Sequence, residues 1–305
     1  MPKKKTINKK ILIVTHSSRF HVDDVFAVAT LSIFLQKKKK KFEIIRSRDP
    51  MVRVKGDYVV DTGDIYNPLE NRFDHHQKGG AGKRENGILY SSFGLVWKKF
   101  GEKLCGSKKI SDKVDRILVQ PIDANDNGID IVIQKDIKLY PYDMRAMIDS
   151  FRPTWKENST FDEYFIQAVS FAKVIIERLI VETSDREAGI ELVKKAYDKS
   201  KDKRLIEVKE KWPWETILNL LPEPLFVIYK VNTDKTWTLK AIRNDILNYS
   251  ETRKKFPKSW AGRRGKELEK VTGVIGSEFC HNGRFIVVAK TREAILKLAS
   301  MALED

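Results

Sequence analysis

The hydrophobic pattern near the start of the chain is typical of an α/β protein. Ile11–Thr15 is a β-branched apolar run of strand length, and Asp23–Gln36 then carries apolar residues at helical spacing. Two more short apolar runs, at Lys41–Arg46 and Tyr58–Asp61, predict two further strands. This order predicts a parallel sheet, whose functional groups are expected beyond the carboxyl ends of its strands.

The pattern changes after these strands. Residues 62–87 are rich in Gly, Asn, Asp and Lys without apolar periodicity, which predicts a long functional loop. Helical spacing returns from Ile88, through Leu95–Phe100 and Val114–Ile122, and a long helical pattern covers Phe161–Lys199. Helices are therefore expected to dominate the middle of the chain.

Short strands mark the last part of the chain. The predicted strands and the final helix lie at Pro224–Val231, Thr236–Ile242, Phe285–Ala289 and Arg292–Leu303. We therefore expect an α/β domain over residues 1–200, with the long helix as its connection, and a smaller α+β domain over residues 201–305. The tryptophans expected in the hydrophobic core, as is usual for large aromatic residues, are Trp97, Trp155, Trp212 and Trp214.

Length and composition exclude several classes of protein. The chain has 305 residues and a mass of 35.3 kDa, which suits two domains. Hydrophobic residues make up 41%, a value that argues against a disordered or fibrous chain. The longest apolar runs, such as Leu225–Tyr229, are far shorter than the roughly 18 residues of a membrane span, so no membrane is expected. Cys105 and Cys280 are too far apart for a metal knuckle and too few for a disulfide framework, which favours a reducing compartment.

The charge balance is strongly basic. The 58 Lys and Arg residues, against 42 Asp and Glu residues, leave a formal net charge of +16. Such a charge favours polyanionic partners, although surface lysine also serves solubility alone. We interpret Lys37–Lys41 as a solvated helix end. The opening MPKKKTINKK lacks the apolar stretch of a secretory signal and is interpreted as a loose basic tail, which makes the cytoplasm the default compartment.

The five histidines are unevenly distributed along the chain. Four of them lie near carboxylates, at positions 16, 21, 75 and 76. The first cluster reads THSSRFHVDDVFA, in which His16 follows the first strand and Asp23 and Asp24 open the helix. Imidazole and carboxylate together suit a divalent ion such as Mn²⁺, Fe²⁺ or Zn²⁺. The alternative is that the aspartates are helix N-terminal charges and the histidines are surface residues.

Two further clusters follow predicted strands or lie in the long loop. Asp61 ends a strand in VVDTGD, at the same sheet edge as His16, where a single aspartate can also be a turn residue. RFDHHQ places Asp74 directly before His75 and His76. Adjacent residues project differently, so one imidazole can bind metal while its neighbour contacts substrate and Asp74 orients a ring nitrogen.

The fourth cluster, PIDANDNG, carries Asp123 and Asp126 three residues apart, which places both on one face if the helix continues that far. Together the four clusters form a His/Asp-rich set able to bind two metal ions. A two-metal site clamps the attacking and leaving oxygens of a phosphoryl displacement and makes hydroxide available near neutral pH. Phosphoester hydrolysis is therefore the reaction that these residues favour.

Basic residues offer candidate contacts for an anionic substrate. GGAGKR at 79–84 is not a nucleoside-triphosphate loop, because Arg84 stands where Ser or Thr is needed and no strand directly precedes it. We interpret its glycines as a lid that places Lys78 near the substrate. Arg263 and Arg264, close to Trp260, suit contacts with phosphate and base.

The order of these motifs resembles the DHH phosphoesterase superfamily, named for the triplet seen here at Asp74–His76. More closely, the chain is similar to the melanocyte proliferating gene one family of DHH-type 3′–5′ exonucleases. The segments that carry this resemblance are THSSRFHVDDVFAVATL, VVDTGDIYNPLENRFDHHQ, SSFGLVWKKFG, RPTW, DANDNG, SWAGRRGKEL and GVIGSEFCHNGRF. The resemblance spans nearly the whole chain.

The resemblance implies a DHH-type parallel-sheet domain with a bimetal site, a connecting helix and a smaller C-terminal substrate-binding domain. The metal would be Mn²⁺, with Mg²⁺, Fe²⁺ or Zn²⁺ as alternatives. By motif position, the implied metal ligands are His16, His21, Asp23, Asp61 and His75, together with Asp123 or Asp126. Asp24 is an alternative to Asp23. His76 would face the scissile phosphate as a catalytic residue with Asp74 beside it, and His281 would contact phosphate unless it is an ordinary turn residue.

We therefore expect a metal-dependent phosphodiesterase, a 3′–5′ exoribonuclease for single-stranded RNA that uses a hydroxide activated by two metal ions. One alternative is a DHH phosphoesterase for pyrophosphate or short oligonucleotides, and another is a nucleic-acid-binding protein without catalysis. The family includes nuclear and mitochondrial members, so these compartments stay open beside the cytoplasm. The sequence does not decide the oligomeric state.

Overall fold

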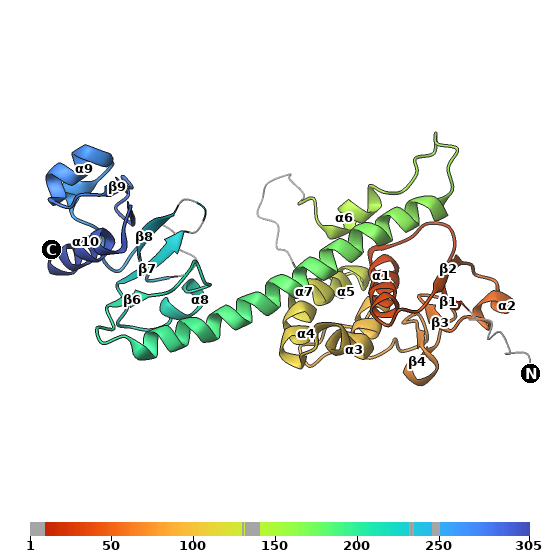
Figure 1. The fold of residues 1–305 in the computed structure, drawn as a ribbon. Helices are drawn as coiled ribbons and strands as arrows, with labels where there is room; N and C mark the ends of the chain where they lie inside the picture. Colours follow the sequence, from red (N-terminus) through yellow and green to blue (C-terminus); the bar gives the residue numbers. More distant parts are fainter. Residues whose placement is uncertain (1–9, 130, 132–140, 232, 234, 246–250) are drawn as a thin grey trace, which may run out of the picture. The chain divides into compact units, whose positions relative to one another are not determined.

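The computed structural model describes residues 10–129, 131, 141–231, 233, 235–245 and 251–305. The chain divides into two compact units, residues 1–184 and residues 185–305, and the division falls inside the long helix α7 (Phe161–Lys199) (Figure 1). The boundary that the sequence placed at residue 200 coincides with the end of this helix. That residue 200 divides two functional domains stays a prediction.

The first unit contains a mostly parallel sheet with the strand order β2-β1-β3-β5-β4. Its strands are β1 (Ile11–Thr15), β2 (Phe42–Arg46), β3 (Tyr58–Val60), β4 (Tyr66–Asn67) and β5 (Arg72–Phe73). Only the hairpin pair β4 and β5 is antiparallel, and Val14 of β1 pairs with both Ile45 and Val59. The predicted parallel sheet is confirmed.

Two of these strands lie where the sequence predicted only loop. β4 and β5 are two residues long each, and a 3₁₀ helix, η1 (Pro68–Glu70), lies between them. Segments this short contain no full period of alternation, so the hydrophobic pattern could not predict them. Their presence matters because β5 leads directly into the DHH triplet.

Helices pack around this sheet and around one another. They are α1 (Val22–Lys37), α2 (Pro50–Arg53), α3 (Ser92–Cys105), α4 (Lys108–Val114), the π-helical segment η2 (Asp115–Val119), α5 (Gln120–Asp126) and α6 (Met144–Asp149). α1 is apolar all round and is buried at every position from Val22 to Ile33, as expected for a helix that packs on several sides. It packs against α3, α5 and α6 and forms the centre of the unit. Its end at Lys37 confirms that the lysine run begins at a helix C-terminus.

The second unit is a five-stranded, mostly antiparallel sheet with helices, so the predicted α+β class is confirmed. Its strands, in the order β6-β7-β8-β10-β9, are β6 (Leu205–Glu207), β7 (Phe226–Val231), β8 (Thr236–Ala241), β10 (Ile286–Ala289) and β9 (Ser277–Cys280). Its other helices are α8 (Glu215–Leu218), η3 (Lys258–Trp260), α9 (Gly265–Thr272) and α10 (Arg292–Glu304). A stack of Phe226, Phe256 and Trp260 fills its core.

The expectation for the tryptophans was wrong at one position. Trp97 and Trp214 are buried and Trp212 is half-buried, but Trp155 is 90% exposed. Trp155 lies in a short irregular segment between α6 and α7, where no helical or strand period directs its side chain inward. Among the described residues, no helix combines the length and the apolar character that crossing a bilayer requires.

Candidate metal centre

Several elements of the first unit end at one place. His16 directly follows β1 and Asp61 directly follows β3, and the DHH triplet follows β5. Parallel strands point their carboxyl ends to the same sheet edge, so these residues are brought together although they are far apart in sequence. The N-terminus of α1, with His21 as its N-cap, and the C-terminal end of α5, with Asp126, complete the cluster.

The first turn of α1 is held by Asp24. One carboxylate oxygen, Oδ1, accepts a hydrogen bond from the backbone N–H of His21 at 2.9 Å. The other, Oδ2, lies 3.1 Å from Nε2 of His16. Asp24 therefore caps the helix and faces His16 at the same time, and both aspartates of the HVDD segment are fully buried.

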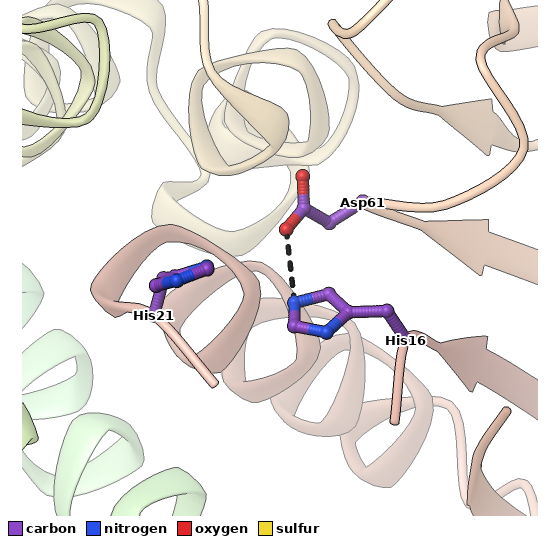
Figure 2. Close-up of side chains that lie close together, drawn as sticks. All are labelled: His16, His21 and Asp61. Carbon is purple, nitrogen blue, oxygen red and sulfur yellow. Dashed lines mark ion pairs between the residues drawn. The ribbon is translucent and has the colours of Figure 1, made fainter. Parts of the chain in front are cut away.

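Asp61 links the two histidine-bearing segments. Its Oδ2 lies 3.3 Å from Nε2 of His16, and its Oδ1 lies 3.5 Å from Nε2 of His75. Figure 2 shows His16, His21 and Asp61 converging from separate segments. Asp61 has a φ of 53°, a left-handed conformation that is costly for a residue with a side chain. Ser92, at the first position of α3, donates to Asp61 Oδ1 at 2.9 Å and holds the carboxylate in place.

The DHH triplet divides into two kinds of environment. Nε2 of His75 lies 3.2 Å from Asp126 Oδ2 and 3.8 Å from Asp23 Oδ2, deep in the cluster. The side chain of His76 is 56% exposed, and its Nδ1 lies 2.7 Å from Asp74 Oδ1. Asp74 is buried and its other oxygen accepts from the backbone N–H of Asp64 at 2.7 Å. His75 thus faces the carboxylates while His76 faces outward.

The described residues contain three adjoining groups whose ligand atoms lie within 4.8 Å of one another. These groups are His16 with His21 and Asp61, Asp61 with His75 and His76, and Asp23 with His75 and Asp126. Asp61 and His75 each belong to two groups. Both carboxylate oxygens of Asp23 are buried without a hydrogen-bond partner. Buried carboxylate oxygens without hydrogen-bond partners suit a divalent cation, so the residues of the cluster fit a metal ion.

The proton affinities reflect this crowding of charge. Burial alone would lower the pKa of His16, but hydrogen bonds to Asp24 and Asp61 outweigh it and raise the pKa to about 10. Burial alone would raise the pKa of Asp61, but hydrogen bonds from His16 and His75 hold it well below its ordinary value. The pKa of Asp23 is raised well above normal by burial and by the nearby charges of Asp61 and Asp126. Asp23 is therefore a buried carboxyl group crowded by other carboxylates.

The sequence left Asp123 and Asp126 as alternative ligands, and in the structure only Asp126 faces the cluster. Asp123 points away from the cluster: its Oδ1 accepts from the Ser91 hydroxyl at 2.5 Å and the Gly94 N–H at 3.0 Å, and its Oδ2 lies 2.7 Å from Arg84. It therefore holds the N-terminus of α3 and is in none of the three groups. Residues three apart lie on the same side of a helix but almost a full turn apart along its axis. Asp123 therefore meets Arg84 and the start of α3, while Asp126, at the helix end, meets His75.

The remaining candidate residues lie elsewhere. Lys78 is exposed in the loop after the DHH triplet. Arg263, Arg264 and His281 belong to the second unit. Arg263 and Arg264 lie beside β9, and His281 directly follows it. The Arg264 guanidinium lies 4.2 Å from the ring centroid of Phe279, and the His281 ring lies 4.3 Å from that of Phe285. Arg263 donates through Nε to the backbone carbonyl of Ser259 at 2.6 Å.

Sequence reasoning missed several supporting residues. Ser92 holds Asp61, and Arg84, which follows the glycines interpreted as a lid, joins Asp123 to Asp115. Arg48, after β2, places Nη2 3.3 Å from Nδ1 of His16. The Ser91-Ser92 pair at the start of the helix was a usable signal, because serine is frequent at helix N-termini. No sequence signal pointed to Arg48 or Arg84, because the residues that they contact are distant in sequence.

Comparison with known proteins identifies the family. The sequence model of MYG1_exonuc, an uncharacterised protein family (UPF0160), matches residues 12–303. The chain belongs to this family. A MYG1 protein of Chlamydia pneumoniae is 30% identical over 299 residues, which cover 96% of this chain and 97% of that protein. The human MYG1 exonuclease is 27% identical over 336 residues, which cover 95% of this chain and 85% of the human protein.

The resemblance drawn from the motifs is therefore confirmed, and with it the prediction of an enzyme. The family model and the mouse and human relatives carry the name exonuclease. The structure also matches RecJ in complex with Mn²⁺ from Thermus thermophilus, with 12% identity and a TM-score of 0.28, over 96% of this chain and 52% of the RecJ chain. The chain spans about half the length of that protein, and a TM-score this low adds nothing to the assignment.

Proposed function

We propose that the enzyme degrades single-stranded RNA from its 3′ end and uses two divalent ions, with Mn²⁺ as the expected metal. The observation that carries the proposal is the buried His/Asp cluster at the carboxyl edge of the first sheet. Its groups share Asp61 and His75, and shared ligands suit two ions held close together. The net charge of +16 supports a polyanionic substrate.

The proposed metal ligands are His16, His21, Asp23, Asp61, His75 and Asp126. Bound divalent ions supply Lewis-acid polarisation of the phosphoryl group and a nucleophile at neutral pH. Asp24 is proposed as a positioning residue instead of a ligand, because one of its oxygens caps α1 while the other faces His16. Ser92 has the same role toward Asp61.

His76 is proposed to contact the scissile phosphate. The hydrogen bond to Asp74 outweighs burial and raises the pKa of His76 to about 9, so both ring nitrogens carry a proton at pH 7. Nδ1 then donates to Asp74, and Nε2 is left to donate to a phosphate oxygen. Asp74 acts through His76 by fixing its ring and its charge.

Substrate contacts are proposed in both units. The Arg264 guanidinium over Phe279 and the His281 imidazole, tilted against Phe285, form a surface that suits the phosphates and bases of a single strand. Arg264 and His281 are the proposed contacts there, with Arg263 beside them. Lys78 is proposed to contact phosphate near the DHH triplet, since it is exposed close to His76 in sequence.

A direct assay tests the proposed reaction. Purified protein is incubated with end-labelled RNA, matching DNA, dinucleotides and pyrophosphate, each with Mn²⁺ or with a chelator. We expect RNA to give a ladder of single-nucleotide steps from the 3′ end that disappears with the chelator. Turnover of dinucleotides or pyrophosphate alone would assign the enzyme to small substrates instead. A ladder that persists with the chelator would remove the metal from the reaction.

Asp126 and Asp123 are expected to behave differently when each is changed to asparagine. Asp126→Asn should weaken Mn²⁺ binding by more than the roughly 10- to 100-fold typical of a residue that only orients a ligand. Asp123→Asn should leave binding nearly unchanged but lower stability by roughly 1–3 kcal/mol, because the buried Arg84 keeps Asp115 but loses the carboxylate of Asp123. Calorimetric titration with Mn²⁺ and thermal denaturation of both variants separate the two effects. Full Mn²⁺ affinity in Asp126→Asn would refute its role as a ligand.

Mn²⁺ binding is expected to tighten as the pH rises from about 6 to 9. The pKa of His16 is raised to about 10 by Asp24 and Asp61, despite burial, so the metal-free protein holds a proton there throughout this range. A metal ion must displace that proton, and each displaced proton makes the apparent affinity rise about tenfold per pH unit. Titrations in buffers with different heats of ionisation count the protons released. An affinity that does not change with pH would contradict this account.

A further inference from the structure

A cavity of about 550 Å³ lies in the second unit and is not part of the sites described above. Its apolar lining comes from Leu192 of α7, Leu205 of β6 and Leu296 of α10. We call it the lysine pocket, because Lys195, Lys199 and Lys209 also line it. Its volume is within the range of small-molecule sites, which is roughly 300–1,000 Å³.

The lysine pocket has an excess of positive charge. All three lysines are exposed, and among the described residues none of them has an acidic side chain as a partner. The carboxylate that lines the pocket, Glu207, is already paired with Arg292, whose Nε and Nη2 donate to its two oxygens at 2.6 and 2.7 Å. The charge of Glu207 is thus balanced without the lysines.

The helix end alone does not explain this arrangement. Lys199 lies in the last turn of α7, where a cation offsets the exposed carbonyl groups. Lys209, however, follows β6 and reaches the same cavity from a different segment. Cations that converge on a concave surface from separate elements suit an anion such as a phosphate group.

One wall of the lysine pocket is aromatic. Trp212 is half-buried against the cluster of Ile206 and Val227, and it also lines the cavity. An indole wall beside apolar side chains suits a flat heterocycle, and stacking on an aromatic side chain is sequence-tolerant because every nucleobase has a π-face. The cavity therefore offers separate surfaces for a base and for its phosphate.

We propose that the lysine pocket binds a nucleotide, with its phosphate at Lys195, Lys199 and Lys209 and its base at Trp212. The nucleotide is either part of a nucleic-acid strand or free in solution, since both present the same chemistry. The proposal deepens the proposed function and rests on it for the choice of ligand. It adds a binding site that is separate from the Arg264 and His281 surface.

The test measures binding in the presence of a chelator, so it does not depend on turnover. Fluorescence anisotropy follows a short labelled single-stranded RNA bound to the full chain and to Lys195→Glu/Lys199→Glu. The matched control is Lys38→Glu/Lys40→Glu, which makes the same charge change at exposed lysines just after the end of α1. Calorimetric titration with AMP forms the second arm.

We expect the pocket variant to bind RNA at least about tenfold more weakly, with a salt slope less steep by about 1.4, while the control binds like the wild type. Weakened RNA binding with no AMP binding to the wild type assigns the pocket to a strand. AMP binding that the pocket variant loses assigns it to a free nucleotide. Three results would overturn the proposal. The pocket variant could bind RNA and AMP as tightly as the wild type, the control variant could lose as much binding as the pocket variant, or the wild type could bind neither RNA nor AMP.

The two proposals fail in different ways. If the wild type binds RNA through the pocket but hydrolyses none with Mn²⁺, the proposed reaction fails and the pocket stands. If the pocket variant both binds and hydrolyses RNA like the wild type, the pocket fails and the reaction stands. Circular dichroism and thermal denaturation confirm that both double variants are folded.

Discussion

Asp61→Asn is expected to reduce metal-dependent phosphodiester hydrolysis by about 10³-fold or more. Asp61 is shared by the group that contains His16 and the group that contains His76, so the change removes charge from both. Metal ions supply several kcal/mol of transition-state stabilisation, and about 4 kcal/mol corresponds to three orders of magnitude in rate. The measurement is the initial rate on end-labelled RNA with saturating Mn²⁺.

The same strand provides the control for this prediction. Asp57 precedes β3 at the opposite end from Asp61, and its Oδ2 accepts a hydrogen bond from the backbone N–H of Leu12 at 2.8 Å. Asp57→Asn also removes a carboxylate charge beside β3 but keeps an oxygen acceptor for Leu12, and it should retain activity. Wild-type rates in folded Asp61→Asn would show that Asp61 is a structural residue only.

Gly94→Ala is expected to be one of the most destabilising single substitutions in the first unit. A Cβ at residue 94 would lie 2.0 Å from Asp123 Oδ2, and Asp123 cannot retreat because Arg84 and Ser91 hold its carboxylate. Overpacking at such a site costs about 3 kcal/mol. For a unit of the size of residues 1–184 that cost lowers the Tm by roughly 6–12 °C, which thermal denaturation measures.

Two comparisons test the cause of this loss. Glu102→Ala, on the exposed side of α3, should change the free energy of unfolding by less than about 0.5 kcal/mol. In a double-mutant cycle, Gly94→Ala should cost less when Asp123 is already alanine, because the clashing carboxylate is gone. Equal costs in both backgrounds would mean that the clash with Asp123 is not the reason.

The sequence predicted the long and strongly patterned elements well. α1 and α7 were predicted to within a residue of their observed starts, because both are long segments in which apolar residues recur at helical spacings, on every side in the case of α1. β1 was predicted at its observed bounds as an isolated β-branched run. The short strands β4 and β5 were missed, since pairing with β3 and with each other, rather than local pattern, determines them.

The candidate site was predicted mainly by the order of strand ends and motifs. His16, Asp61 and His75 were expected to converge, and the structure brings them within contact distance. The choice between Asp123 and Asp126 could not be made, because their spacing fits either residue as a ligand. That choice depends on where Arg84 and Ser91 lie, and both are distant in sequence from α5.

The amino-acid sequence by itself determined the parallel sheet, the family and the kinds of side chain available for chemistry, because these follow from local periodicity and from motif order. Only the tertiary structure decided which aspartate faces the cluster, which residues orient the ligands and where the second unit forms a cationic pocket. These properties depend on distances between segments far apart in the chain, and packing sets those distances.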